Sequence, residues 1–147
     1  MSKPFEEYRI GEAFESHART ITETDLVNFT CFAGLTMPMF IDEEYCKLHS
    51  PFGTRIAPGM MTASIAAGMM EAIHGPHVLA GLGIKELKFV TPVIPGDTLH
   101  TRITVESMRP TSDGIRGVLA VRVVALNQRG ETALEFETSF LMKKGGK

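Results

Sequence analysis

Residues 55–73, RIAPGMMTASIAAGMMEAI, constrain the possible folds more than any other part of the chain. From Gly59 onward almost every side chain is apolar or small, which predicts a helix that is buried because it has no face for water. At about fifteen residues the helix is too short to span a bilayer, which needs roughly 20. We therefore expect one soluble domain built around this helix, with no membrane partner.

Pro58 and Gly59 stand at the start of this predicted helix. Proline favours a first helical turn, and glycine lets another backbone or a ligand approach closely. The first N–H groups of a helix lack partners within the helix, so they can stabilise negative charge. Two interpretations follow: a site for an anionic or carbonyl group, or only a core helix with a tight entry turn.

The composition is that of a single globular domain over residues 1–147, with 44% apolar and 22% charged residues. A net charge of −2 provides no basic field for nucleic acid, so no nucleic-acid partner is expected. Cys31, in an expected buried helix, and Cys46 have no metal or redox spacing, and we predict no metal site. With the acidic, polar N-terminal residues, this predicts a cytoplasmic protein.

The N-terminal half is predicted to contain two further helices. Residues 13–21 have strand character. A helix then begins after Thr22 or Thr24 as N-cap and ends at Gly34. Residues 35–41 are an unusually apolar loop, and Asp42 caps a short helix over residues 43–49.

The C-terminal half has the two-residue period of strands. Residues 98–108 and 132–142 alternate between apolar and polar side chains, and residues 115–126 are apolar enough for a central strand. Turn residues separate them at 95–97, 111–114 and 127–130. The predicted fold is α+β, a curved antiparallel sheet wrapped around the buried helix, with one edge left for a second copy.

Three motifs in this order resemble a known family. They are R-I-A-x-G-M at residues 55–60, P-G-D-T-L at 95–99 and N-Q-R-G-E at 127–131. Over roughly residues 8–143 the chain resembles the MaoC-like acyl-CoA dehydratases and (R)-specific enoyl-CoA hydratases of the hotdog superfamily. The resemblance implies a hotdog fold, a homodimer with active sites between subunits, and an acyl thioester of coenzyme A as substrate, with no other cofactor. It also implies reversible addition of water across a 2-enoyl double bond, a lyase reaction of fatty acid metabolism.

The family's proton-transfer residues are replaced in this chain. The family motif G-D-x-N-P-x-H-x-D falls on residues 34–42, GLTMPMFID, so Pro38 and Asp42 fit. The family's Asp falls on Leu35 and its His on Phe40, while Pro58 replaces the usual His before the helix glycine. Leu and Phe cannot transfer protons, so we do not expect this chain alone to run the usual mechanism.

The binding half of the site carries over from the resemblance. Gly59 and Met60 would supply the backbone N–H groups for the thioester carbonyl. The other predicted substrate-binding residues are Leu35, Thr36, Phe40, Arg55, Ile56 and Ala57. Lys85, Lys88 and Arg109 are candidates for the phosphates of coenzyme A, although surface solvation explains them as well.

Three functional hypotheses remain open. The first is an acyl-CoA-binding subunit, homodimeric or in a hetero-oligomer with a catalytic hotdog subunit. The second is a hydratase or thioesterase with rewired residues, for which His49 or a carboxylate of residues 42–44 would have to reach the site. The third is a non-catalytic binder of acyl or lipid-like ligands, in which Leu35 and Phe40 complete an apolar pocket.

Overall fold

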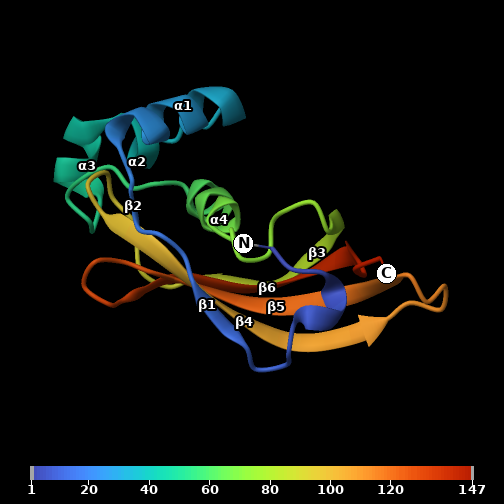
Figure 1. Cartoon of the computed structure of the whole chain (residues 1–147). Coiled ribbons are helices and arrows are strands. Elements are labelled where there is room, and N and C mark those ends of the chain that lie inside the picture. The colour runs from blue at the N-terminus through green and yellow to red at the C-terminus, as the bar shows by residue number, and fades with distance from the viewer. Residues whose placement is uncertain (1, 147) are drawn as a thin grey trace.

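Four long strands form the body of a curved antiparallel sheet. The computed structural model describes residues 2–146, and its strands are β3 (Val78–Phe89), β4 (Thr98–Pro110), β5 (Arg116–Leu126) and β6 (Thr132–Lys143). The sheet order is β1-β4-β5-β6-β3, so β3 pairs with the last strand of the chain (Figure 1). The predicted alternation is confirmed: Leu99, Ile103 and Val105 of β4 are buried, while Arg102 and Glu106 are exposed.

Short N-terminal elements cover the other edge of the sheet. After the 3₁₀ helix η1 (Phe5–Glu7), β1 (Ala13–Glu15) and β2 (Arg19–Thr20) both pair with β4. The strand predicted over residues 13–21 is therefore divided in two. Ser16 marks the break, since its backbone N–H donates to Thr101 and its hydroxyl accepts from the Thr101 N–H at 2.8 Å.

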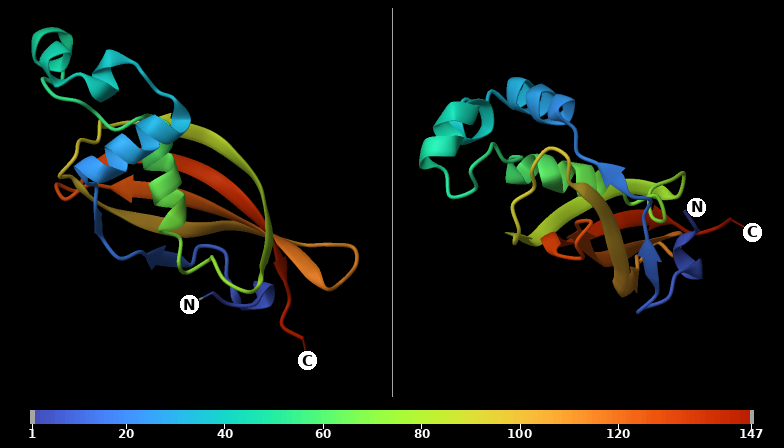
Figure 2. Two further views of the ribbon diagram at one scale, coloured as in Figure 1. Left: turned by 90° about the horizontal axis from the view of Figure 1, so that it is seen from above. Right: turned by 90° about the vertical axis from the view of Figure 1, so that its left-hand side faces the viewer.

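Helix α4 (Gly59–Gly68) lies across the concave face of the sheet (Figures 1 and 2). It buries Met61, Ala63 and Ala66, and the chain continues to Met70 and Ile73, which are fully buried beneath it. The prediction of a helix of about fifteen residues, buried on every face, is wrong on both counts. The helix ends at Gly68, and because the sheet covers only one side of it, Met60 remains 55% exposed.

Three helices form an overhang beyond the start of α4. They are α1 (Glu23–Ala33), α2 (Pro38–Ile41) and α3 (Glu43–His49), and Figure 2 shows them reaching past the sheet. Helix α1 has the predicted cap, because Thr22 and Asp25 form a reciprocal capping box, and Gly34 ends the helix at a φ of 66°.

Two predictions within the overhang are corrected by the structure. The apolar segment expected as a loop contains α2, which forms because Pro38 occupies a first-turn position where its missing N–H costs nothing. Cys31 is exposed, since only one side of α1 packs on the rest of the molecule, whereas Cys46 is buried. Asp42 caps α3 as predicted and accepts a 2.8 Å hydrogen bond from the Tyr45 N–H.

Strand β3 leaves one edge of the sheet unpaired among the described residues. Most of its residues are exposed, including the apolar side chains Leu82, Ile84 and Phe89. Its register against β6 shifts at three places, and Glu86 lies at a φ of 50° in the last of them. Such bulges bend a strand, which fits the strong curvature of the sheet around α4.

Candidate functional site

A cavity of about 510 Å³ opens beside the first turn of α4. Its walls come from the segment 35–40 that includes most of α2, the loop before α4, the end of β3 and residues 90–93 that follow it. Every lining side chain is uncharged; these residues are Leu35, Met37, Met39, Phe40, Ile56, Ala57, Pro58, Gly59, Met60, Thr62, Phe89, Val90, Thr91, Pro92, Val93 and Ala133.

The start of α4 supplies the strongest polar feature of this cavity. Pro58 is the N-cap and offers no side-chain hydrogen bond, and the N–H groups of Gly59 and Met60 have no acceptor among residues 2–146. These N–H groups and the positive end of the helix dipole favour an oxygen that carries negative charge. The sequence predicted this feature.

The ring of Phe89 covers Gly59. A Cβ atom added at Gly59 would lie 2.7, 2.8 and 2.9 Å from three ring carbons of Phe89, far inside ordinary carbon contact distance. Glycine at the first helical position is therefore favoured by this contact with the ring and not by backbone conformation, since its φ is not in the left-handed region. Sequence reasoning missed Phe89 and the residues after it, although the apolar run Phe89-Val90-Thr91-Pro92-Val93 at a strand end was a usable signal.

Backbone hydrogen bonds hold the loop wall in place. The Ile56 N–H donates to the Met39 carbonyl at 3.3 Å, and the Ala57 N–H donates to the Val93 carbonyl at 2.7 Å. These bonds attach the loop to α2 on one side and to the segment after β3 on the other. Ile56 and Ala57 consequently line the cavity, as Leu35 and Phe40 also do.

Hydroxyl groups are the only polar side-chain groups in the lining. Thr62 is 4% exposed, and its hydroxyl lies 3.5 Å from the Pro58 carbonyl oxygen of the same helical turn. Thr91 is the second. A threonine without an adjacent base is a poor nucleophile, so the lining holds no group that takes up or releases a proton near neutral pH.

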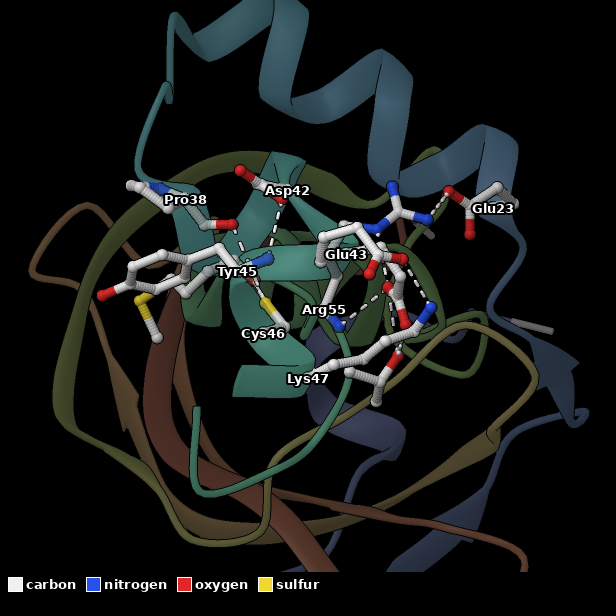
Figure 3. A network of polar contacts seen from close by, with 11 residues as sticks. Glu23, Pro38, Asp42, Glu43, Tyr45, Cys46, Lys47 and Arg55 are labelled. Atoms are coloured by element: carbon white, nitrogen blue, oxygen red, sulfur yellow. Dashed lines mark hydrogen bonds and ion pairs between the residues drawn. The ribbon is translucent and has the colours of Figure 1, made fainter. Parts of the chain in front are cut away.

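Arg55 joins the overhang to the loop instead of lining the cavity (Figure 3). Its Nη2 lies 2.6 Å from Glu23 Oε1 on α1, and its Nε donates to Glu43 Oε2 on α3 at 3.0 Å. The Thr54 hydroxyl also donates to Glu43, at 3.1 Å. The hydrogen bonds from Arg55 lower the pKa of Glu43, and the reciprocal contacts raise the pKa of Arg55. We call Arg55, Glu23 and Glu43 the overhang clamp.

The remaining predicted site residues lie outside the cavity lining. Thr36 is not part of it, so its contact with substrate, like that of Arg55, stays a prediction. His49 packs against the Tyr45 ring with the ring centroids 4.9 Å apart. Asp42 caps α3, and Glu44 pairs with Lys47 at 2.7 Å, so these carboxylates serve α3.

Lys88, near the end of β3, is already paired. Lys88 lies 3.9 Å from Glu135, which also accepts a 2.7 Å hydrogen bond from Arg122. Within residues 2–146, no group of three or more His, Cys, Asp or Glu side chains is placed to hold a metal ion. No helix of this part of the chain is long and apolar enough to cross a membrane.

A larger groove of about 730 Å³ runs between α1 and the outer side of α4. It is lined by apolar side chains such as Phe29, Phe32 and Ile65, with His17, Arg19, Asp25 and Glu71 at its margins. Arg19 and Asp25 pair with each other at 2.6 Å. This groove does not include the free N–H groups of α4, so the smaller cavity is the candidate functional site.

Comparison with known proteins supports the fold and the family that the sequence motifs predict. The family model described as "MaoC like domain" matches residues 5–127. "(R)-specific enoyl-CoA hydratase" of Rhodospirillum rubrum is 37% identical over 113 residues, which are 72% of this chain and 72% of that protein. "Protein MaoC" of Klebsiella aerogenes is 37% identical over 102 residues, 69% of this chain but only 30% of that protein's length.

Solved structures match over nearly the whole chain. "Monoamine oxidase regulatory protein from Archaeoglobus fulgius" superposes with a TM-score of 0.88 at 34% identity, covering 99% of this chain and 98% of that one. A Mycobacterium tuberculosis protein described as having "a double hotdogfold" superposes with a TM-score of 0.87 at 20% identity, over 98% of this chain and 45% of its own. The fold is therefore the predicted hotdog fold, and the chain belongs to the MaoC-like domain family.

Proposed function

We propose that this chain binds an acyl-CoA thioester at the start of α4 and acts as the partner subunit of a hetero-oligomeric hydratase. In this proposal the proton-transferring side chains belong to the other subunit. The observation that carries the proposal is the cavity itself, in which open backbone N–H groups lie beside a lining without a single ionisable side chain.

The free N–H groups support binding of the thioester. The carbonyl oxygen of an acyl thioester would accept hydrogen bonds from the N–H groups of Gly59 and Met60, and the apolar lining would hold the acyl chain. Addition of water to C3 of an enoyl thioester places enolate-like charge on that oxygen, and preorganised N–H donors stabilise such charge. Binding of the thioester and stabilisation of this charge by backbone N–H groups do not depend on titratable side chains.

The lining argues against hydration by the chain alone. Hydration needs a base that takes a proton from water and an acid that delivers one to C2. Leu35 and Phe40, which the resemblance aligns with the family's Asp and His, both line the cavity. The titratable groups considered as replacements, His49 and the carboxylates of residues 42–44, are not part of the lining.

The unpaired edge of the sheet supports assembly with a second hotdog chain. Strand β3 exposes apolar side chains along this edge and ends at Phe89 and Val90 in the cavity wall. A partner packed there would cover apolar surface and could bring its own side chains to the cavity. In this proposal the partner is a catalytic relative in a hetero-oligomer, acting in the cytoplasm on acyl-CoA of fatty acid metabolism.

Two measurements test the proposal. The purified chain is expected to bind crotonyl-CoA in calorimetry but not to hydrate it, as followed by loss of enoyl thioester absorbance. Co-expression with catalytic MaoC-like chains of the same cell is expected to yield a mixed oligomer by co-purification and sizing. Rapid hydration by the isolated chain, persisting in a His49→Ala variant, would refute the proposal, as would a chain that stays homomeric beside every candidate partner.

One observation favours a second function, a non-catalytic binder of apolar ligands. Leu35 and Phe40 complete an entirely uncharged lining, which suits an acyl or lipid-like ligand without coenzyme A. Calorimetry separates the two functions: fatty acyl esters that bind as tightly as the matching CoA thioesters favour the binder, and clearly tighter CoA thioesters favour the hydratase subunit.

A further inference from the structure

Beyond the start of α4, the side chains that this chain contributes to the cavity offer no partner to a charged group of the ligand. The N–H groups of Gly59 and Met60 are engaged by the thioester carbonyl in the proposed function. The rest of the lining contains aliphatic, aromatic, thioether and hydroxyl side chains only. A second anionic group on the acyl chain would therefore enter a region without a cation.

The charged residues that precede the lining residues in the sequence do not supply a free cation to the cavity. Arg55 precedes Ile56, but its guanidinium already contacts two carboxylates, so the overhang clamp has one positive and two negative charges, a net charge of −1. Lys88 precedes Phe89 and therefore projects to the opposite face of β3, where Glu135 lies 3.9 Å away. The clamp therefore supplies no net positive charge to an anion in the cavity.

We infer that this site selects acyl groups without charge and rejects acyl groups that end in a carboxylate. The inference rests on the proposed function, because it places the acyl chain of a thioester in this cavity. Burying an ionised carboxylate without a hydrogen-bonding or charged partner is strongly unfavourable, whereas a methyl terminus gains from the apolar lining. Selection thus follows from solvation, not from the shape of the cavity.

Shape itself would discriminate weakly. The volume of about 510 Å³ lies within the roughly 300–1,000 Å³ of ordinary ligand sites. Three of the wall residues are the flexible side chains Met37, Met39 and Met60. Methionine adapts to ligands of different outline, so linear and branched neutral acyl groups are expected to bind with similar affinity.

A pair of six-carbon thioesters isolates the effect of charge. Hexanoyl-CoA and adipoyl-CoA share coenzyme A and differ only at the distal end, so the ratio of their dissociation constants reports the acyl group. By calorimetry at pH 7.5 we expect hexanoyl-CoA to bind at least about 100-fold more tightly, because a buried unpaired carboxylate is costly. Lowering the pH toward 5 should reduce the ratio, since a carboxyl with a pKa of about 4.3 becomes partly neutral there.

A cation placed at the cavity wall should weaken the selection. Met37 lines the cavity and is 52% exposed, so a Met37→Lys side chain of similar length can stay hydrated without a ligand. We expect Met37→Lys to lower the hexanoyl-to-adipoyl ratio at least about tenfold through a partly buried charge pair, and Met37→Gln, the uncharged control, to preserve it.

The outcomes separate the two ideas. Equal affinity of the native chain for hexanoyl-CoA and adipoyl-CoA overturns the charge selection and leaves the proposed function intact. Binding of neither thioester overturns the proposed function and the charge selection with it. An equal loss of selectivity in Met37→Lys and Met37→Gln also overturns the inference, because polarity or size rather than charge would then decide.

Discussion

The contact between Gly59 and Phe89 yields a quantitative prediction for a single methyl group. In Gly59→Ala, the added Cβ would lie 2.7–2.9 Å from three ring carbons of Phe89. Carbon atoms in optimal contact are about 3.5–4.0 Å apart, so the ring has to withdraw by roughly 1 Å. The backbone of residue 59 does not oppose alanine, because its φ is not in the left-handed region.

Two opposing terms set the expected change in stability. Overpacking of this kind costs about 1–3 kcal/mol. Replacing a helical glycine with alanine returns up to about 1 kcal/mol of backbone entropy. Gly59→Ala should therefore lower the free energy of unfolding by about 0–3 kcal/mol. In a Phe89→Ala background the clash disappears, and the same substitution should be neutral or stabilising by up to about 1 kcal/mol.

Chemical denaturation of four proteins measures this coupling. The native chain, Gly59→Ala, Phe89→Ala and the double variant are unfolded in urea at one fixed protein concentration, because oligomers make stability concentration-dependent. The predicted coupling free energy is about 1–3 kcal/mol. Gly68→Ala, at the other end of α4, is the matched control, since no atom lies within 4 Å of its added Cβ. It should have the same effect in both backgrounds.

A single result would refute this reasoning. Gly59→Ala and Phe89→Ala effects that add to within about 0.5 kcal/mol would show that the ring does not lie on Gly59 in solution. Binding provides an independent measurement. The displaced ring and the new methyl group both narrow the approach to the N–H groups of α4, so hexanoyl-CoA should bind more weakly to Gly59→Ala and unchanged to Gly68→Ala.

Three further predictions concern other parts of the molecule. The double variant Leu35→Asp, Phe40→His should hydrate crotonyl-CoA about 10²–10⁴-fold faster than the native chain, because general acid–base groups contribute that much. Loss of enoyl thioester absorbance measures the rate. A variant that folds and binds the ligand but gains no activity would show that these positions do not face the reacting carbons. Arg55→Met should speed amide hydrogen exchange in residues 23–49 roughly tenfold while β5 and β6 stay protected, since two carboxylates lose their shared cation; uniform acceleration would contradict a local clamp. Burial acts to raise the pKa of Asp97, but hydrogen bonds from Gln128, the Ile94 N–H and Arg129 outweigh it and hold the pKa below 3.8. A carboxyl with a lowered pKa stabilises the fold above pH 3.8 and loses that contribution as the pH falls through its pKa in the folded state. In Asp97→Asn the free energy of unfolding, measured in urea, should therefore depend less on pH below 3.8. An unchanged pH dependence in this range would contradict the prediction.

Patterns set by neighbouring residues predicted much of the fold. The two-residue period placed β4 and β6, and Asp42 and Gly34 marked helix ends that the structure confirms. Such patterns are reliable because alternation, capping and turn formation depend on residues a few positions apart. The replacement of the family's ionisable residues by Leu35 and Phe40 stays a prediction from the sequence, and the structure shows that both side chains line the cavity.

Features that depend on distant segments were not predictable. The ion pairs of Arg55 with Glu23 and Glu43 join segments that are 12 or more residues apart, and no pattern near Arg55 indicates them. Phe89 meets Gly59 across thirty residues of chain, and although the apolar run that begins at Phe89 indicates a buried or ligand-facing segment, it does not indicate that the ring contacts Gly59.

The sequence by itself therefore determined where most of the strands and helices form, and it predicted that apolar side chains stand at the positions of the family's proton carriers. Only the tertiary structure decided that α4 is covered on one side, that Phe89 lies on its first residue, and that Arg55 is held by carboxylates. The physical reason is that backbone period and caps are local, whereas contacts between side chains depend on which surfaces the folded sheet brings together.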